Sequence, residues 1–121
     1  MTSSSLVIKV TVGKDDAERC NQAFNIAATA VASGVPVSLW LAGEGAWLGL
    51  PDQAEQIRLA YATPLAELLA AILQGGTVTV CAQCAARREI TEDDLIKGVR
   101  IAGAATFVAE VMAEGAKALV Y

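Results

Sequence analysis

The cysteine pair Cys81 and Cys84 is the feature of this sequence whose residue types and spacing best suit chemistry. The pair opens a short segment that ends in two arginines, Arg87 and Arg88. A deprotonated cysteine is a nucleophile and a metal ligand, so two nearby thiols can carry sulfur, form a disulfide or bind a metal. Two thiolates supply only half of a tetrahedral zinc shell, and the sequence contains no histidine to complete it. We therefore expect thiol chemistry with no metal and no cofactor.

The elements predicted around the pair favour a thiolate. Residues 77–80 have the pattern of a strand, and residues 82–88 predict a helix. Cys81 then lies where the strand ends and the helix begins, beside unpaired backbone N–H groups that lower a thiol pKa. Arg87 and Arg88 follow Cys84 by three and four residues, on the same helical face. Either guanidinium is a candidate to stabilise an anionic sulfur or to bind an anionic donor.

The third cysteine has a different setting. Cys20 lies among the apolar positions of a predicted helix, which is typical of a packed side chain. An odd number of cysteines, three in all, favours free thiols over a disulfide framework. Free thiols are in turn typical of a cytoplasmic protein.

Five predicted strands alternate with helices along the chain and must position the cysteine pair. The strands cover residues 6–12, 35–41, 77–80, 99–102 and 117–121. This order predicts an α/β fold, a three-layer α/β/α sandwich with a five-stranded parallel sheet. We expect a single domain over residues 1–121, with a flexible N-terminal segment at residues 1–5.

The predicted helical segments begin and end at capping and breaking residues. The first runs from a capping box at Asp15 and Glu18 to Gly34, and the third runs from the N-cap Thr63 to Gly75. A short turn of helix is capped by Thr91 and Asp94. The other predicted helices cover residues 52–61, 82–88 and 105–114.

The loops that follow the strands complete the expected site. In parallel sheets, ligands and reactive groups gather at the carboxyl ends of the strands. The loop of Gly43, Glu44 and Gly45 follows the second strand but lacks the spacing of a phosphate-binding loop. We expect this loop to border the cysteine pocket, with Glu44 as either a polar gate or a solvated carboxylate.

Composition excludes several kinds of partner. The net charge is −4 and no run of Lys or Arg is present, so we expect no binding of nucleic acid. No apolar stretch is long enough to span a membrane. The hydrophobic fraction is 55% although aromatic residues make up only 5%, which predicts apolar surface buried in an oligomer. We therefore expect a cytoplasmic oligomer.

The cysteine segment resembles the DsrE-like (DsrE/DsrF/DsrH) superfamily, whose sulfur-relay members include the TusD-type subunits. The resemblance rests on Cys81 at the exit of the third strand, followed by Ala85-Ala86-Arg87-Arg88 and Ile90. It implies a five-stranded parallel sheet between helices, and assembly into trimers, hexamers or complexes with paralogous subunits. It also implies that Cys81 accepts sulfane sulfur as a persulfide and passes it from a donor to an acceptor protein. The chain departs from the relay pattern at Glu89, where glycine is typical, and at Cys84, an added thiol.

Three functions remain open. The leading hypothesis is a persulfide carrier of sulfurtransferase type, with Cys81 as nucleophile and Cys84 as a candidate resolving thiol. The second is a dithiol redox protein that cycles a disulfide between these two cysteines. The third is a non-catalytic oligomeric binding module whose cysteines pack in the core.

Overall fold

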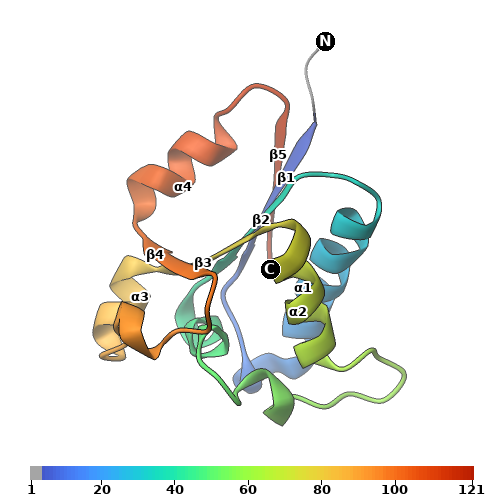
Figure 1. The fold of residues 1–121 in the computed structure, drawn as a ribbon, viewed down its shortest axis with the longest axis vertical. Coiled ribbons are helices and arrows are strands. Elements are labelled where there is room, and N and C mark those ends of the chain that lie inside the picture. The colour runs from blue at the N-terminus through green and yellow to red at the C-terminus, as the bar shows by residue number, and fades with distance from the viewer. Residues whose placement is uncertain (1–3) are drawn as a thin grey trace.

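The protein folds around a five-stranded parallel sheet (Figure 1). The structure is a computed structural model and describes residues 4–121. The strands lie in the order β4-β3-β2-β1-β5, and every neighbouring pair is parallel. Their bounds are β1 (Ser5–Val10), β2 (Val37–Leu41), β3 (Thr77–Cys81), β4 (Val99–Ala102) and β5 (Ala116–Val120). The predicted fold class is confirmed.

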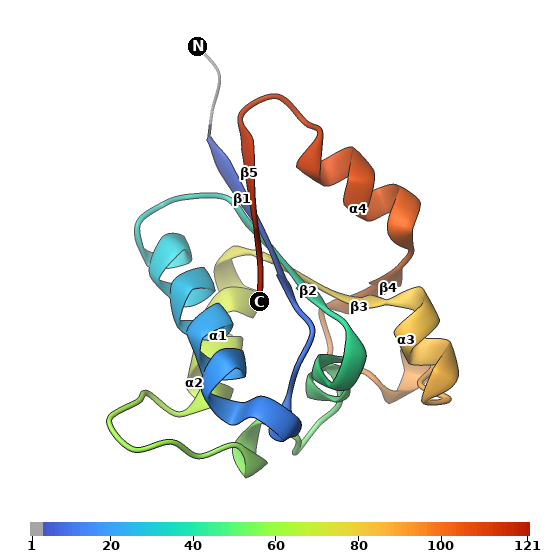
Figure 2. The same cartoon turned by 180° about the vertical axis from the view of Figure 1, so that it is seen from behind.

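One layer of helices encloses the apolar core. α1 (Ala17–Ala32) and α2 (Leu65–Gly75) pack against each other on one face of the sheet (Figures 1 and 2). Strand side chains alternate between the two faces of a sheet, and here one set is apolar and almost completely buried. This set comprises Ile8, Val10, Val37, Leu39, Leu41, Val78 and Val80. Burial of this surface against the two helices is the main driving force for folding.

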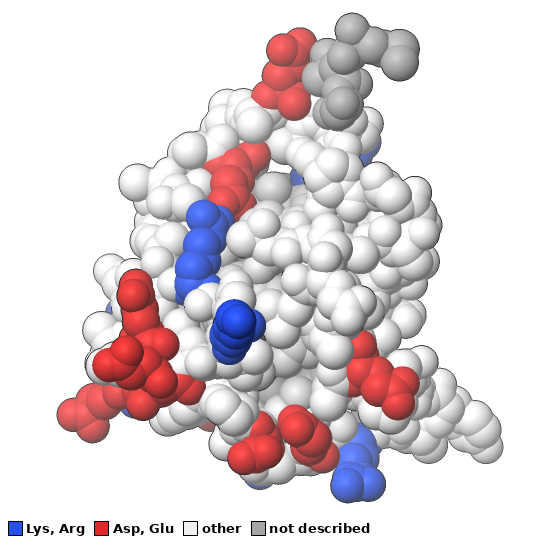
Figure 3. All heavy atoms as spheres, viewed as in Figure 1, with Lys and Arg blue, Asp and Glu red and all other residues white. Residues whose placement is uncertain are grey.

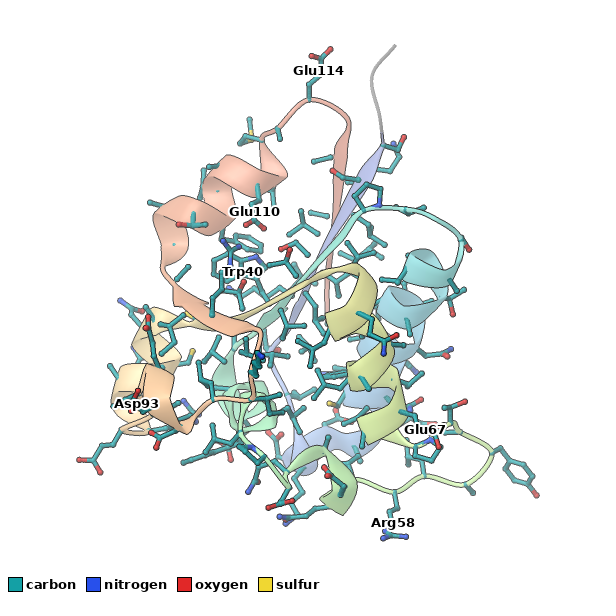
Figure 4. All side chains as sticks on the ribbon, viewed as in Figure 1. Trp40, Arg58, Glu67, Asp93, Glu110 and Glu114 are labelled. Atoms are coloured by element: carbon teal, nitrogen blue, oxygen red, sulfur yellow. The ribbon has the colours of Figure 1, made fainter. Side chains whose placement is uncertain are left out.

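The opposite face of the sheet is covered through polar as well as apolar contacts. α3 (Ala82–Arg87) and α4 (Ala104–Val111) lie on this side (Figure 2). Glu110 of α4 accepts hydrogen bonds from Ser38 Oγ at 2.6 Å and from Trp40 Nε1 at 2.9 Å, and it pairs with Arg100 of β4. Figure 4 shows Trp40 and Glu110 facing each other between α4 and the sheet. A polar cluster therefore fastens α4 to the sheet.

This cluster also sets the charge of its carboxylate. Burial raises the pKa of Glu110, but the hydrogen bonds from Ser38, Trp40 and Arg100 and the positive charge of Arg100 lower it more. The pKa of Glu110 therefore lies below its usual range, and the carboxylate stays ionised.

Several predicted local signals are confirmed. The predicted turn is a 3₁₀ helix, η4 (Glu92–Asp94), in which Thr91 and Asp94 form the expected capping box. The first helix ends just before Gly34, whose φ of 83° lies in the left-handed region that favours glycine. The strand at Val99–Ala102 has the predicted bounds.

Two N-cap predictions are wrong by one residue. The N-cap of α1 is Asp16, whose carboxylate accepts a hydrogen bond from the Arg19 N–H at 3.2 Å. Asp15 instead accepts from the N–H of Gly13 at 2.8 Å, so it closes the preceding turn, where the 3₁₀ helix η1 (Lys14–Asp16) lies. The N-cap of α2 is Pro64 and not Thr63.

Two predictions between β2 and α2 are also wrong. The loop expected at Gly43, Glu44 and Gly45 is part of a 3₁₀ helix, η2 (Gly43–Gly49). The helix expected over residues 52–61 is reduced to a single 3₁₀ turn, η3 (Ala54–Gln56). The turn ends at Ile57, whose φ of −97° and ψ of 113° are extended, and Asp52 and Tyr61 at the two ends of the segment take left-handed φ values of 69° and 59°.

The N-terminal prediction is only partly open to comparison. Residues 1–3 of the flexible segment expected at residues 1–5 lie outside the described residues. Ser5 differs from that prediction, because it begins β1 and pairs with Ala116 of β5. Within residues 4–121, no helix has the length and apolar character required to cross a membrane. Figure 3 shows acidic and basic side chains interspersed over one face of the molecule.

Candidate functional site

Cys81 lies at the junction that the sequence predicted. It is the last residue of β3 and the N-cap of α3, with φ −61° and ψ 127°. Because its backbone is still extended while Ala82 is already helical, the thiol stands beside the first N–H groups of the helix. The residue is half-buried and its thiol is free.

The surroundings of Cys81 favour its thiolate. Burial acts in the opposite direction and raises the pKa of this thiol. The side chain makes no capping hydrogen bond in this geometry, but the backbone N–H groups of Cys84 and Gln83 in the first turn of α3 lower the pKa of the thiol. Together with the Cys84 side chain as a donor and the charge of Lys9, they hold the pKa of Cys81 below its ordinary value.

Cys84 connects this thiol to the loop after β2. The residue is buried, and its Sγ accepts a hydrogen bond from the Gly43 N–H at 3.2 Å. The Gly43 amide thus holds the Cys84 sulfur, and the Cys84 side chain in turn lowers the pKa of Cys81. Gly43 has φ 52°, and a Cβ there would lie 2.4 Å from the carbonyl oxygen of Thr11. Only glycine brings this amide so close to β1 and to Cys84 together.

Glu44 and Arg88 form an ion pair at the edge of the site. Glu44 Oε2 accepts hydrogen bonds from Arg88 Nη2 at 2.8 Å and from Nε at 3.1 Å. Arg88 Nη1 also donates to the carbonyl oxygen of Cys84 at 3.2 Å, and Trp47 Nε1 donates to Glu44 Oε2 at 3.3 Å. The pair thus links η2 to α3. The guanidinium of Arg88 is directed to a carboxylate and a carbonyl oxygen and not to a cysteine sulfur.

The remaining predicted site residues lie further from the sulfur atoms. Arg87 is exposed on the surface of α3. Gly45 is buried against the end of β1, where a Cβ would lie 2.9 Å from the carbonyl oxygen of Val12. The structure therefore brings together Cys81, Cys84, Gly43, Glu44 and Arg88, whereas Arg87 and Gly45 stand apart.

The turn after α3 has a strained residue where relay subunits typically have glycine. The N–H of Glu89 bonds to the Ala86 carbonyl at 3.2 Å, and the N–H of Ile90 bonds to the Ala85 carbonyl at 2.9 Å. This pattern is a Schellman motif, in which the residue after the C-cap takes the left-handed conformation. Glu89 indeed has φ 56°. Glycine would adopt this conformation without the steric cost that Glu89 carries.

The third cysteine is remote from this chemistry. Cys20 is fully buried in the core cluster under α1, as its apolar setting predicted. Burial, with a smaller contribution from the charges of Asp15 and Asp16, raises its pKa to about 12. Its thiol therefore stays protonated at neutral pH. Among the described residues, no group of three or more His, Cys, Asp or Glu side chains is arranged to hold a metal ion.

Sequence reasoning missed one residue of the site, Lys9. The strand Ser5–Val10 is otherwise uncharged, so a lysine inside it was the available signal. Its importance depends on strand register, because Lys9 and Cys81 are 72 positions apart in the chain and meet only through the order of the strands.

A parallel five-stranded sheet with a cysteine where the third strand meets a short helix defines this protein as a DsrE-like α/β protein. The model of the DsrE/DsrF-like family matches residues 4–121. The chain belongs to this family.

The curated relatives are archaeal proteins whose names give no activity. Uncharacterized protein MJ0989 of Methanocaldococcus jannaschii is 30% identical over 102 residues, which cover 84% of this chain and 84% of that protein. Uncharacterized protein MJ0760 of the same organism is 32% identical over 104 residues, or 85% of this chain, but the match spans only 38% of that longer protein. Uncharacterized protein MK0008 of Methanopyrus kandleri is 33% identical over 85 residues, covering 70% of this chain and 68% of that protein.

Solved structures share the fold at low sequence identity. The ychN protein from E. coli superposes with a TM-score of 0.80 at 19% identity, covering 98% of this chain and 99% of that chain. Protein MTH1491 from Methanobacterium thermoautotrophicum, of unknown function, has a TM-score of 0.72 at 15% identity and covers 98% of this chain and 100% of that chain.

Proposed function

We propose that this protein carries sulfane sulfur as a persulfide on Cys81. The observation that carries the proposal is the setting of this thiol, which is half-buried, free and held below its ordinary pKa at the N-terminus of α3. Membership of the DsrE/DsrF-like family supports the same function. A low-pKa, accessible thiol is what a sulfur carrier requires, because the thiolate is the attacking species.

The proposed reaction is a pair of displacements at sulfur. The Cys81 thiolate attacks the outer sulfur of a sulfane donor, the S–S bond of the donor breaks, and the leaving group departs with the electron pair. An acceptor thiolate then attacks the outer sulfur of the Cys81 persulfide and releases the Cys81 thiolate. No external oxidant or reductant is consumed. The N–H groups of Gln83 and Cys84 stabilise the sulfur anion at both stages.

The position of Cys84 favours a second candidate function. The residue lies three positions after Cys81 in the first turn of α3, and its side chain lowers the pKa of the Cys81 thiol. Attack of the Cys84 thiolate on the inner sulfur of a Cys81 persulfide would form a disulfide and release hydrosulfide. A dithiol protein would instead cycle this disulfide with a dithiol or disulfide partner that supplies or removes two electrons.

We further propose a cytoplasmic homo-oligomer, a trimer or hexamer, or a complex with paralogous subunits. Three free cysteines fit a reducing compartment. Large apolar side chains are exposed on α4 and on the edge strand β5, among them Val108 at 54% and Val120 at 66%, and Met112 at the C-cap of α4 is exposed at 76%. Exposed apolar residues on adjacent elements are typical of a protein interface. Sulfur donor and acceptor proteins would be further partners.

Intact-mass spectrometry of the reduced protein after incubation with a sulfane-sulfur donor tests the proposed function. Wild type, Cys81→Ser and Cys84→Ser are compared. The carrier function predicts a gain of one sulfur atom that a reductant removes, lost in Cys81→Ser and retained in Cys84→Ser. A loss of two hydrogens without added sulfur would support the dithiol candidate. If the folded variants stay unmodified while the unfolded chain reacts, the cysteines are structural and both candidates fail.

A further inference from the structure

On the face of the sheet that carries Cys81, a row of mostly polar side chains crosses neighbouring strands two residues before the level of Cys81. Strand register places Lys9 of β1 beside Trp40 of β2, Trp40 beside Thr79 of β3, and Thr79 beside Arg100 of β4. Cys81 lies two residues beyond Thr79 on β3 and therefore points to the same face. This is the face covered by α3 and α4, so Lys9 and Cys81 share one side of the sheet.

Lys9 is held on this face by an aromatic pair. Its Nζ lies 5.2 Å from the ring centroid of Phe107 in α4. The Phe107 ring in turn packs edge-on against Trp40, with centroids 5.3 Å apart and an interplanar angle of 84°. A cation over an aromatic face keeps its full charge, whereas a cation bound to a carboxylate is neutralised. In the part of the chain that the structure describes, no carboxylate pairs with Lys9, so the aromatic pair holds an uncompensated ammonium group on the face of the sheet that carries Cys81.

The other cations near the site are neutralised or turned outward. Arg88 pairs with Glu44 at 2.8 Å, and Arg100 pairs with Glu110. Arg87 is exposed on α3. The charged groups on the elements packed around this face are Lys9 on β1, Arg87 and the C-cap Arg88 of α3, Glu44 on η2, Arg100 on β4 and Glu110 on α4. The Cys84 thiol is the further titratable group that acts on Cys81. Within residues 4–121, Lys9 is the cation that shares this face of the sheet without a carboxylate partner, and its charge adds to the lowering of the Cys81 pKa.

We propose that Lys9 is the positioning cation of the Cys81 site and that its ammonium group favours anionic reactants over neutral ones. Sequence reasoning assigned this role to Arg87 and Arg88. The substrate class that follows, a small sulfur donor with a negative charge beside its transferable sulfur, rests on the proposed carrier function. The electrostatic role of Lys9 does not, because it is a property of the thiol environment alone.

The test compares the alkylation of Cys81 by iodoacetate, which is anionic, with alkylation by iodoacetamide, which is neutral. All proteins carry Cys84→Ser, so that Cys81 is the reactive thiol, since Cys20 is buried. The variants are Lys9→Gln, Lys9→Arg and the control Lys117→Gln. Lys117 pairs in register with Leu6, so it belongs to the opposite face of the same sheet, and its loss changes net charge equally.

The expected results distinguish an effect of the Lys9 charge at the site from an effect of the net charge of the protein. Lys9→Gln lowers the ratio of the iodoacetate rate to the iodoacetamide rate by about two- to fivefold, as a unit charge at several ångströms in a partly solvated site would. It also shifts the pH profile of iodoacetamide alkylation upward. Lys9→Arg restores both values, and Lys117→Gln leaves both unchanged. In the protein with Lys9, the same ratio falls as salt is raised.

Three results would overturn the inference. These are an unchanged ratio in Lys9→Gln, an equal decrease in Lys117→Gln, or a ratio with Lys9 present that salt does not affect. The last measurement needs no substitution at Lys9, so it holds even if a variant fails to fold. Persulfide loading is not measured here, so a failed carrier function and a failed role of Lys9 give different results.

Discussion

The lowering of the Cys81 pKa by the Cys84 side chain predicts how substitution of Cys84 changes the reactivity of its neighbour, if that side chain acts as a hydrogen-bond donor. Cys84→Ala removes the donor, whereas Cys84→Ser keeps an O–H donor of similar size. A hydrogen bond to a charged group contributes about 1.5 kcal/mol, and one pKa unit corresponds to about 1.4 kcal/mol. The pKa of Cys81 should therefore lie about one unit higher in Cys84→Ala than in Cys84→Ser. The backbone N–H of residue 84 remains in both variants.

The rate of iodoacetamide alkylation as a function of pH measures this difference. Each variant has a single reactive thiol, because Cys20 is fully buried and burial raises its pKa to about 12. The comparison between two variants also avoids the coupled titration of two neighbouring thiols in the wild type. Equal midpoints in the two variants would refute the reasoning, because the Cys84 side chain would then have no part in stabilising the Cys81 thiolate.

Further predictions concern stability, measured by urea denaturation. Gly34→Ala should lower the free energy of unfolding by about 1 kcal/mol, because φ is 83° but the space around a Cβ is open. Gly43→Ala should lower it by at least twice as much, since its Cβ would lie 2.4 Å from the Thr11 carbonyl oxygen. Similar losses in the two variants would contradict the close approach of this loop to the end of β1. Glu89→Gly should raise stability by about 0.5–1 kcal/mol, because relief of left-handed strain exceeds the entropy that glycine loses on folding; a decrease would mean that the Glu89 side chain makes a stabilising contact. Since the pKa of Glu110 is lowered in the fold, the stability that its charge contributes is fully present above its unfolded pKa of about 4.3 and is lost as pH falls through the folded pKa. The advantage of wild type over Glu110→Gln should shrink over that acidic range, and a constant difference would be inconsistent with the cluster under α4.

The sequence predicted the features that depend on local pattern. Apolar runs and helix breakers located the five strands. The position of Cys81 between a strand and a helix followed from the change of pattern at residue 82. The meeting of the Gly43 loop with the cysteines followed from the rule that carboxyl ends of parallel strands share one edge.

Features that depend on strand order and on side-chain partners could not be predicted in this way. The role of Lys9 requires β1 to lie two strands from β3, which is a property of the sheet order. Arg88 was expected beside a sulfur because helical spacing fixes its face, but spacing does not reveal the Glu44 carboxylate that binds it. The helix expected over residues 52–61 stops at the extended backbone of Ile57, between two non-glycine residues with left-handed φ values, none of which composition indicates.

Location of the added sulfur by tandem mass spectrometry tests the central claim most directly. After loading with a sulfane donor and trapping with an alkylating agent, tryptic cleavage after Arg58 and Arg87 yields one peptide that contains both Cys81 and Cys84. Fragment ions that separate these two residues assign the sulfur. The account predicts that the added sulfur is on Cys81, in the wild type and in Cys84→Ser alike. Sulfur found on Cys84 with an unmodified Cys81, or a loaded Cys81→Ser variant, would contradict it.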